Sequence, residues 1–283
     1  MDAALQALTP QLSRRLPDPV AEVVEYALAG PGKRVRGVLM LLAHEAAGGA
    51  RDVAPLAAAV EVVHAYSLVH DDLPCMDDDE MRRGRATVHR RFGVEAATVA
   101  GVAMVPLAVI AAATAGPRAG LPQHVSATIV NELMRAAGGG GMIGGQLLDL
   151  EAEGRALDLA GMDRLHSAKT GALFAAAARI GGIAAEADAR RVDALTSFGG
   201  ALGLAFQITD DVLDVTASAA QLGKDAGRDA ALHKSTYPAA IGVAAAAARA
   251  RTLVDDACAD LAAAGIPTDR LGRFAGLAVT RDV

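Results

Sequence analysis

The chain contains no tryptophan, and its three tyrosines and five phenylalanines are few for 283 residues. Aromatic and β-branched residues are the usual strand formers, whereas alanine, the most frequent residue here, has the highest helix propensity. Segments of helical length, roughly ten in all, alternate with short clusters of glycine and proline. The sequence therefore predicts an all-α fold.

Cysteine is also scarce. The two cysteines, Cys75 and Cys258, cannot form the disulfide framework of a small secreted domain. The first residues lack the basic and apolar regions of a secretory signal, so we expect a cytoplasmic protein. No linker rich in Ser, Pro and Gly divides the chain, and no repeat of fixed period is present. We therefore expect residues 1–283 to form a single domain with one large core.

Basic charge is in deficit, with 27 Lys and Arg against 33 Asp and Glu. The basic residues lie close to acidic ones and form no stripe, which argues against nucleic acid as a partner. One uncharged stretch, residues 96–116, is long enough to cross a bilayer. It is built from Ala, Gly, Val and Thr with Pro106 in its middle, so we favour a buried central helix over stable membrane insertion.

Two acidic clusters are the most distinctive feature of the sequence. Six of the ten residues from Asp71 to Glu80 are acidic, and a second cluster contains Asp210, Asp211 and Asp214. Like charges at this density repel one another unless a cation binds them. Oxygen ligands favour Mg²⁺, which completes its shell with water and substrate phosphate. Taken alone, the first cluster could instead be a solvated acidic turn.

The local sequence predicts where the first cluster lies. Residues 61–69 have a helical pattern, and His64 and Asp71, seven residues apart, share one face. Pro74 disfavours helix at the residue before it, so Asp77 should lie on the turn just beyond the helix end.

In the second cluster, Asp210 and Asp214 are one helical turn apart, and Gln207 lies one turn earlier on nearly the same side. If the helices that carry the two clusters are antiparallel neighbours, the clusters can face each other across a cavity. That geometry would hold a polyphosphate through bridging metal ions.

Basic residues accompany both clusters. They are Lys33, Arg34, Arg36, Arg82, Arg83, Arg85, Lys169, Lys224 and Lys234. This number of separated cations exceeds the need of a single phosphate. It suggests two diphosphates, one chelated by metal and the other bound directly by Lys and Arg.

The acidic and basic residues belong to longer motifs, which are Gly32-Lys33-Arg34-Val35-Arg36, His64 through Arg83 with Asp-Asp-x4-Asp, Gly144-Gly145-Gln146 leading to Asp149, Lys169-Thr170-Gly171, Phe206-Gln207 into Asp-Asp-x2-Asp, and Lys224 to Lys234-Ser235-Thr236-Tyr237-Pro238. Together these motifs resemble those of the trans-isoprenyl diphosphate synthases (polyprenyl synthetases), over nearly the whole chain. The resemblance implies a bundle of long antiparallel helices around a deep central cavity, usually in a homodimer.

The resemblance also implies a Mg²⁺-dependent prenyltransferase. Such an enzyme joins isopentenyl diphosphate head to tail (1′-4) to dimethylallyl or geranyl diphosphate and releases pyrophosphate. Metals and basic residues would stabilise the charge that develops on the leaving group, in a pocket that excludes water. The isopentenyl double bond would then attack the allylic cation, so no Ser, Cys or Asp nucleophile is required.

The family motifs imply a role for each matching residue. Two Mg²⁺ ions would be bound by Asp71 and Asp77 with support from Asp72, and a third by Asp210 and Asp214. The allylic diphosphate would be bound by Arg82, Lys169 and Lys224. Isopentenyl diphosphate would be bound by Lys33, Arg36, His64 and Arg83. Oxygen dipoles near the allylic carbon would come from Thr170 and Gln207.

Product length depends on what closes the channel beneath Asp71. Tyr66 and Ser67 lie about one helical turn before it. In the family, an aromatic residue at the first of these positions, with a two-residue insertion in the acid motif (present here), resembles bacterial farnesyl-type enzymes. We therefore favour farnesyl diphosphate (C15) as the product. Small residues on a facing helix could open the channel to geranylgeranyl diphosphate (C20).

Two other functions are considered. A non-catalytic subunit of a heteromeric prenyl synthase usually lacks one acid cluster or the isopentenyl-binding residues, and both are present here. A terpene cyclase binds only one diphosphate and would have no use for the second set of basic residues. The few aromatic residues would also stabilise cyclised cations poorly.

Overall fold

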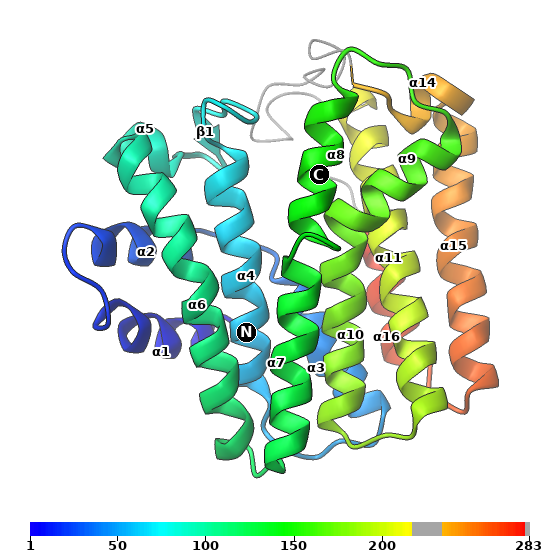
Figure 1. The fold of residues 1–283 in the computed structure, drawn as a ribbon. Helices are drawn as coiled ribbons and strands as arrows, with labels where there is room; N and C mark the ends of the chain where they lie inside the picture. The colour runs from blue at the N-terminus through cyan, green and yellow to red at the C-terminus, as the bar shows by residue number, and fades with distance from the viewer. Residues whose placement is uncertain (217–233, 281–283) are drawn as a thin grey trace. The chain divides into compact units, whose positions relative to one another are not determined.

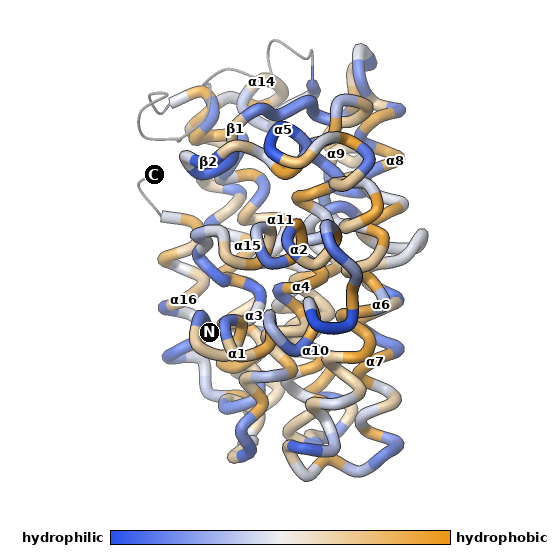
Figure 2. Tube along the Cα trace, turned by 90° about the vertical axis from the view of Figure 1, so that its left-hand side faces the viewer, coloured by the Kyte–Doolittle hydropathy of each residue, from blue (hydrophilic) through white to orange (hydrophobic). Residues whose placement is uncertain are grey.

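The computed structural model describes residues 1–216 and 234–280. Within these ranges the regular structure is helical apart from one short hairpin (Figure 1), so the all-α prediction is confirmed. Lys224, predicted to bind the allylic diphosphate, lies outside the described residues. Hydrophobic and hydrophilic residues are interspersed along the helices (Figure 2), as expected for helices that each bury one face.

The chain divides into two compact units. The first contains residues 1–41 and 51–133. Its elements are α1 (Asp2–Ser13), α2 (Val20–Leu28), the start of α3 (Val35–Ala46), α4 (Ala54–Asp71), β1 (Met81–Arg82), β2 (Arg85–Ala86), α5 (Val88–Phe92), α6 (Val94–Arg118) and most of α7 (Gln123–Ala137). Because the chain divides into two units, the single domain expected for residues 1–283 stays a prediction.

Helix α4 lies at the core of this unit, where it packs against α1, α2 and α6. Its start is marked by Pro55, which costs no hydrogen bond in the first helical turn. Its last residue is Asp71, and Asp72 forms the C-cap. The helix therefore ends just before Pro74, as predicted.

Helix α6 buries only one of its faces. Ala97, Ala100 and Met104 are buried, but Val99 and Val102 are 53% and 61% exposed. By length and composition it is the one helix in the described part of the chain that could cross a membrane. The expectation of a buried central helix is therefore correct for one face of α6 and wrong for the other.

The second unit contains residues 42–50 and the chain from 134 onward. Its elements are α8 (Met142–Ala152), α9 (Leu159–His166), the π-helix η1 (Ser167–Gly171), α10 (Ala172–Ala184), α11 (Ala189–Thr216), α14 (Tyr237–Ile241), α15 (Val243–Ala263) and α16 (Asp269–Val279). Helix α11 packs against α10, α15 and η1.

Glycines allow α11 to approach its neighbours closely. A Cβ atom at Gly203 would lie 2.7 Å from the Cα of Gly171, and one at Gly199 would lie 2.5 Å from the carbonyl oxygen of Phe174. Larger side chains would force these helices apart. The close contact brings the polar end of α11 alongside η1.

Candidate active site

The first acidic cluster forms a folded loop after α4. The Asp77 N–H donates to the carbonyl oxygen of Asp71 at 2.9 Å, and the Asp78 N–H donates to that of Leu73 at 3.1 Å. Asp77 therefore lies on the turn beyond the helix end, as predicted. Asp78 has a left-handed φ of 49°, which aspartate tolerates better than most residues.

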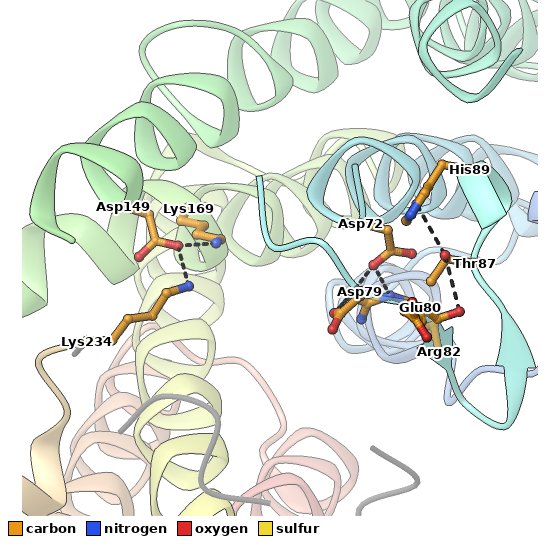
Figure 3. Close-up of polar contacts among 9 residues, drawn as sticks. All are labelled: Asp72, Asp79, Glu80, Arg82, Thr87, His89, Asp149, Lys169 and Lys234. Atoms are coloured by element: carbon orange, nitrogen blue, oxygen red, sulfur yellow. Dashed lines mark hydrogen bonds and ion pairs between the residues drawn. The ribbon is translucent and has the colours of Figure 1, made fainter. Parts of the chain in front are cut away.

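Arg82 is held between two carboxylates of this loop (Figure 3). Its Nε donates to Asp72 Oδ1 at 2.7 Å, and its Nη2 donates to Asp79 Oδ2 at 2.9 Å. Burial alone would lower the pKa of Arg82, but its contact with Asp72 raises it. Burial raises the pKa of the Asp72 carboxyl, and Arg82 opposes that rise. The pair therefore fixes the guanidinium in a charged state.

Asp79 was not among the predicted site residues. It is buried at 7% exposure and contacts Arg82 three residues later. The acidic run suggested only a supply of metal ligands. Its spacing to Arg82 was the available signal, but the loop geometry decides which of the aspartates reaches the guanidinium.

A basic cavity of about 70 Å³ lies in the first unit. Its acidic and basic lining residues are Arg34, Glu61, His64, Asp72, Arg82, Arg83 and Arg85. Arg36 Nη1 lies 3.3 Å from His64 Nε2. Burial, followed by the charges of Arg36 and Arg83, lowers the pKa of His64 well below 6.5. The imidazole is therefore neutral at pH 7 and can accept a hydrogen bond from Arg36.

These contacts bring together three of the four residues predicted to bind isopentenyl diphosphate. Arg36 contacts His64, and Arg83 lines the cavity with it. The fourth, Lys33, is exposed in the loop before α3.

Glu61 is a further buried charge at this cavity that sequence reasoning did not select. It is 3% exposed and accepts a hydrogen bond from the Gly37 N–H at 2.7 Å. The isolated charge in the apolar run of α4 was the signal that could have identified it.

The predicted chain-length residues lie on α4 before Asp71. Tyr66 is 5% exposed, and its ring meets the His70 ring edge-on with centroids 5.5 Å apart. Burial raises the pKa of Tyr66, and the charge of Asp71 adds to this effect. The Ser67 hydroxyl donates to the His64 carbonyl oxygen at 2.9 Å.

In the second unit, Asp149 on α8 lies between two lysines (Figure 3). Lys169 donates to Asp149 Oδ2, and the Lys234 ammonium lies 3.4 Å from the same oxygen. Burial raises the pKa of Asp149, but the two lysines outweigh burial and lower it. All three residues line a cavity of about 110 Å³, together with His166, Gln207 and Asp211.

Local backbone structure explains this cluster. A Cβ atom at Gly145 would lie 2.2 Å from the backbone nitrogen of Lys169. Only glycine therefore lets α8 approach η1 closely enough for Asp149 to reach Lys169. The π-helical turn that carries Lys169 is a rare conformation that occurs frequently at functional sites.

Hydrogen bonds connect the remaining polar residues of this cavity. The Thr170 hydroxyl donates to Gln207 Oε1 at 3.2 Å, and Gln207 Nε2 donates to Asp211 Oδ1 at 3.1 Å. The other oxygen of Asp211 accepts from the Tyr237 N–H at 3.2 Å. The structure thus brings together Thr170 and Gln207, both of which were predicted site residues.

Asp214 is buried at 6% exposure, and neither of its carboxylate oxygens has a hydrogen-bond partner within the described ranges. Asp210 is half-buried one turn earlier on α11. Buried carboxylate oxygens are unfavourable unless a cation, a donor or water binds them. This donor set fits the predicted Mg²⁺.

The described residues contain no group of three or more His, Cys, Asp or Glu side chains close enough to hold a metal by themselves. Mg²⁺ would therefore need phosphate and water oxygens to complete its coordination shell, as it usually does in phosphate-binding sites.

His166 and a hydrogen-bonded triad of Tyr237, Asp163 and Arg249 support the second cavity, and no site role was predicted for any of them. Burial lowers the pKa of His166 to about 4, and its ring lies 5.7 Å from that of Tyr237. The Tyr237 hydroxyl donates to Asp163 at 2.7 Å, and Arg249 donates to the same carboxylate at 2.6 Å. Arg249 is 86 residues from Asp163, so local sequence spacing carries no signal for the pair.

The model of the polyprenyl synthetase family matches residues 17–263. The chain belongs to this family. The match confirms the predicted resemblance and, with it, the class of prenyltransferase.

Known polyprenyl synthetases resemble this one over most of their length. The farnesyl diphosphate synthase of Escherichia coli (strain K12) is 45% identical over 243 residues, which cover 84% of this chain and 80% of that protein. Geranylgeranyl pyrophosphate synthase 7 of Arabidopsis thaliana is 41% identical over 260 residues, or 90% and 74% of the two chains.

Among solved structures, a geranyltransferase from Helicobacter pylori, complexed with magnesium and isoprenyl diphosphate, is 28% identical with a TM-score of 0.81. The match covers 98% of this chain and 94% of that one. Such neighbours confirm the isoprenyl synthase type of fold.

Proposed function

We propose that this polyprenyl synthetase condenses isopentenyl diphosphate with dimethylallyl or geranyl diphosphate, head to tail (1′-4), to form farnesyl diphosphate. The observation that carries the proposal is the arginine cavity around neutral His64, beside the carboxylate loop that begins at Asp71. A terpene cyclase binds only one diphosphate, so it has no need for this arginine cavity in addition to the metal-binding carboxylates. The 45% identity to a farnesyl diphosphate synthase supports the same choice.

In this proposal the two diphosphates are bound by different basic residues. Isopentenyl diphosphate is bound by Lys33, Arg36, His64 and Arg83. The allylic diphosphate is bound by Arg82, Lys169 and Lys224. Because His64 is neutral, it adds no charge and instead orients the Arg36 guanidinium by accepting its hydrogen bond.

Polyprenyl synthetases in general depend on Mg²⁺. When bound, Mg²⁺ would neutralise the diphosphate and stabilise the charge on the departing pyrophosphate. We assign three ions to the enzyme. Asp71, Asp72 and Asp77 would hold two of them, and Asp210 and Asp214 the third.

The chain's own residues act on the carbon skeleton by position and charge. As the allylic C–O bond breaks, the oxygens of Thr170 and Gln207 stabilise the positive charge left on the allylic carbon. The isopentenyl double bond forms the new C–C bond, and pyrophosphate accepts the proton that is lost. No covalent enzyme intermediate is needed.

The assembly and location are also part of the proposal. Val99 and Val102 form an exposed apolar face on α6, which supports a homodimer in which a second copy covers this face. We assign the enzyme to the cytoplasm and treat residues 1–283 as one synthase domain.

Geranylgeranyl diphosphate is the second candidate product, because the Arabidopsis relative is named for it. The test is to incubate the purified protein with isopentenyl diphosphate, each allylic starter and Mg²⁺, and to measure product chain lengths. Mainly C15 product is expected, because Tyr66 is buried one turn before Asp71. Mainly C20 product would refute the argument from Tyr66, and no product would indicate a non-catalytic subunit.

A further inference from the structure

The β1–β2 hairpin carries two of the proposed diphosphate ligands, Arg82 and Arg83, yet it is very small. Its strands pair only through Met81 with Ala86 and Arg82 with Arg85. The turn places both Arg83 and Gly84 at positive φ, 53° and 75°. A hairpin of this size is not stable by itself, so contacts outside it must hold Arg83 in position.

Arg82 has such contacts within the acidic loop, where Asp72 and Asp79 bind its guanidinium. Arg83 is held differently. Its Nη1 donates to the Pro31 carbonyl oxygen at 2.8 Å, in the turn that follows α2. The position of Arg83 therefore depends on how the hairpin sits against α2.

Tyr26 on α2 contacts both residues of β2. Its hydroxyl donates to the Ala86 carbonyl oxygen at 2.8 Å. The Arg85 guanidinium lies over its ring at 4.0 Å from the centroid, within the range of a cation–π interaction.

The same ring joins the hairpin to α5. Arg91 lies 4.5 Å from the Tyr26 ring centroid, and Phe92 meets that ring edge-on at 5.3 Å. Tyr26 also lines the basic cavity that contains His64 and Arg83. One side chain thus joins α2, β2 and α5 at the edge of a proposed substrate site.

We propose that Tyr26 is a positioning residue, which fixes the hairpin so that Arg83 presents its guanidinium to the diphosphate of the non-allylic substrate. This inference rests on the proposed function of Arg83. It predicts that a change at Tyr26 weakens binding of isopentenyl diphosphate more than binding of the allylic substrate. Arg82 keeps its two carboxylate partners when Tyr26 is changed, whereas Arg83 loses the support of its hairpin.

The test compares Tyr26→Leu with Tyr26→Phe in the full-length enzyme. Tyr26→Leu removes the ring and the hydroxyl, and we expect KM for isopentenyl diphosphate to rise about tenfold. We expect KM for the allylic substrate and kcat to change less than about threefold. Tyr26→Phe keeps the stacked ring and should raise KM for isopentenyl diphosphate only about threefold.

Two further variants serve as references. Phe92→Leu removes a ring that meets Tyr26 from α5, and it should leave KM for isopentenyl diphosphate within about twofold. Arg83→Ala removes the proposed ligand of isopentenyl diphosphate itself, and its KM gives the largest rise that loss of Arg83 can cause. If Tyr26→Leu is unfolded by circular dichroism, Arg85→Gln removes the cation–π contact from the hairpin side and leaves the Tyr26 hydroxyl bond to Ala86. It should raise KM for isopentenyl diphosphate selectively, but less than Tyr26→Leu.

An unchanged KM for isopentenyl diphosphate, or an equal rise for both substrates, would overturn the proposal. Calorimetric binding of isopentenyl diphosphate separates this outcome from failure of the proposed function. Binding that weakens in Tyr26→Leu without any turnover in the wild type would refute synthase activity and leave the role of Tyr26 intact. A wild-type protein that neither binds nor converts isopentenyl diphosphate would overturn both.

Discussion

In the first unit the charged side chains come from a helix end, a loop and a hairpin, whereas in the second most come from packed helices. Arg82 meets Asp72 and Asp79 because the chain turns back on itself after α4. Asp149 and Lys169 meet because a glycine lets α8 lie against η1. The first arrangement depends on turn geometry and paired charges, and the second depends on helix packing.

The largest expected effects test whether both acidic groups are needed for the reaction. Asp71→Ala in the first unit and Asp210→Ala in the second should each lower turnover by orders of magnitude, because each removes a proposed metal ligand. Circular dichroism should show that both variants remain helical. Asp78→Asn, on an exposed residue of the same loop, is the matched control. Unchanged turnover in either alanine variant would remove that residue from the site.

A second prediction concerns helix packing. At Gly145 an added Cβ would lie 2.2 Å from a backbone atom, whereas at Gly101 it would lie 2.1 Å from the His70 side chain. A side chain can move more easily than a helix backbone. Gly145→Ala should therefore lower turnover about tenfold or more and destabilise the protein by about 2 kcal/mol. Gly101→Ala should reduce both turnover and stability by less.

Turnover and thermal unfolding measure both effects. Gly140→Ala is the control, because a Cβ atom there meets no atom within 4 Å. If Gly145→Ala is as active and stable as Gly140→Ala, close packing of α8 on η1 does not determine the position of Asp149.

The carboxylate that holds Arg82 provides a smaller effect. Asp79→Asn keeps the side-chain shape but removes the negative charge that faces the Arg82 guanidinium. It should raise KM for the allylic substrate about fivefold. Glu80→Gln changes the next residue, whose ion pair with Arg90 is exposed, and it should have little effect. Equal effects of the two variants would show that the contact with Asp79 does not position Arg82.

The last prediction concerns stability at low pH rather than substrate binding or turnover. Both His64 and His166 have pKa values below 6.5 in the folded protein, about 4 for His166. Between pH 6.5 and 4 the unfolded chain therefore binds more protons than the folded one, and stability should fall as pH falls. The contribution of His166 is on the order of 2 kcal/mol at pH 4.

Thermal unfolding across this pH range tests the prediction. His166→Gln should flatten the decline, whereas His124→Gln, at an exposed position, should follow the wild type. A His166→Gln variant that loses stability as steeply as the wild type would show that this imidazole is not kept neutral by burial.

Several features of the site were predictable because they depend on neighbouring residues. The end of α4 before Pro74 follows from proline stereochemistry, and Asp77 lies on the turn as expected. The helical spacing of Asp210 and Asp214 is likewise a property of one continuous helix, α11.

Other features could not be predicted because their partners are far apart in the chain. Glu61 accepts from Gly37 at a separation of 24 residues, and Tyr26 reaches Ala86 at a separation of 60. The exposed face of α6 was missed for a related reason. Its composition is apolar all round, and only packing decides which face is covered.

By itself, the sequence determined the helical class, the two acidic motifs and the family, since propensity, spacing and proline act over a few residues. The tertiary structure decided which charges meet. It paired Arg82 with Asp72 and Asp79 and placed Asp149 between two lysines. It left both oxygens of Asp214 without a hydrogen-bond partner in the described part of the chain. A buried polar group forms hydrogen bonds with the side chains that helix packing brings close to it. Those side chains can lie anywhere in the sequence, so no local pattern predicts the pairing.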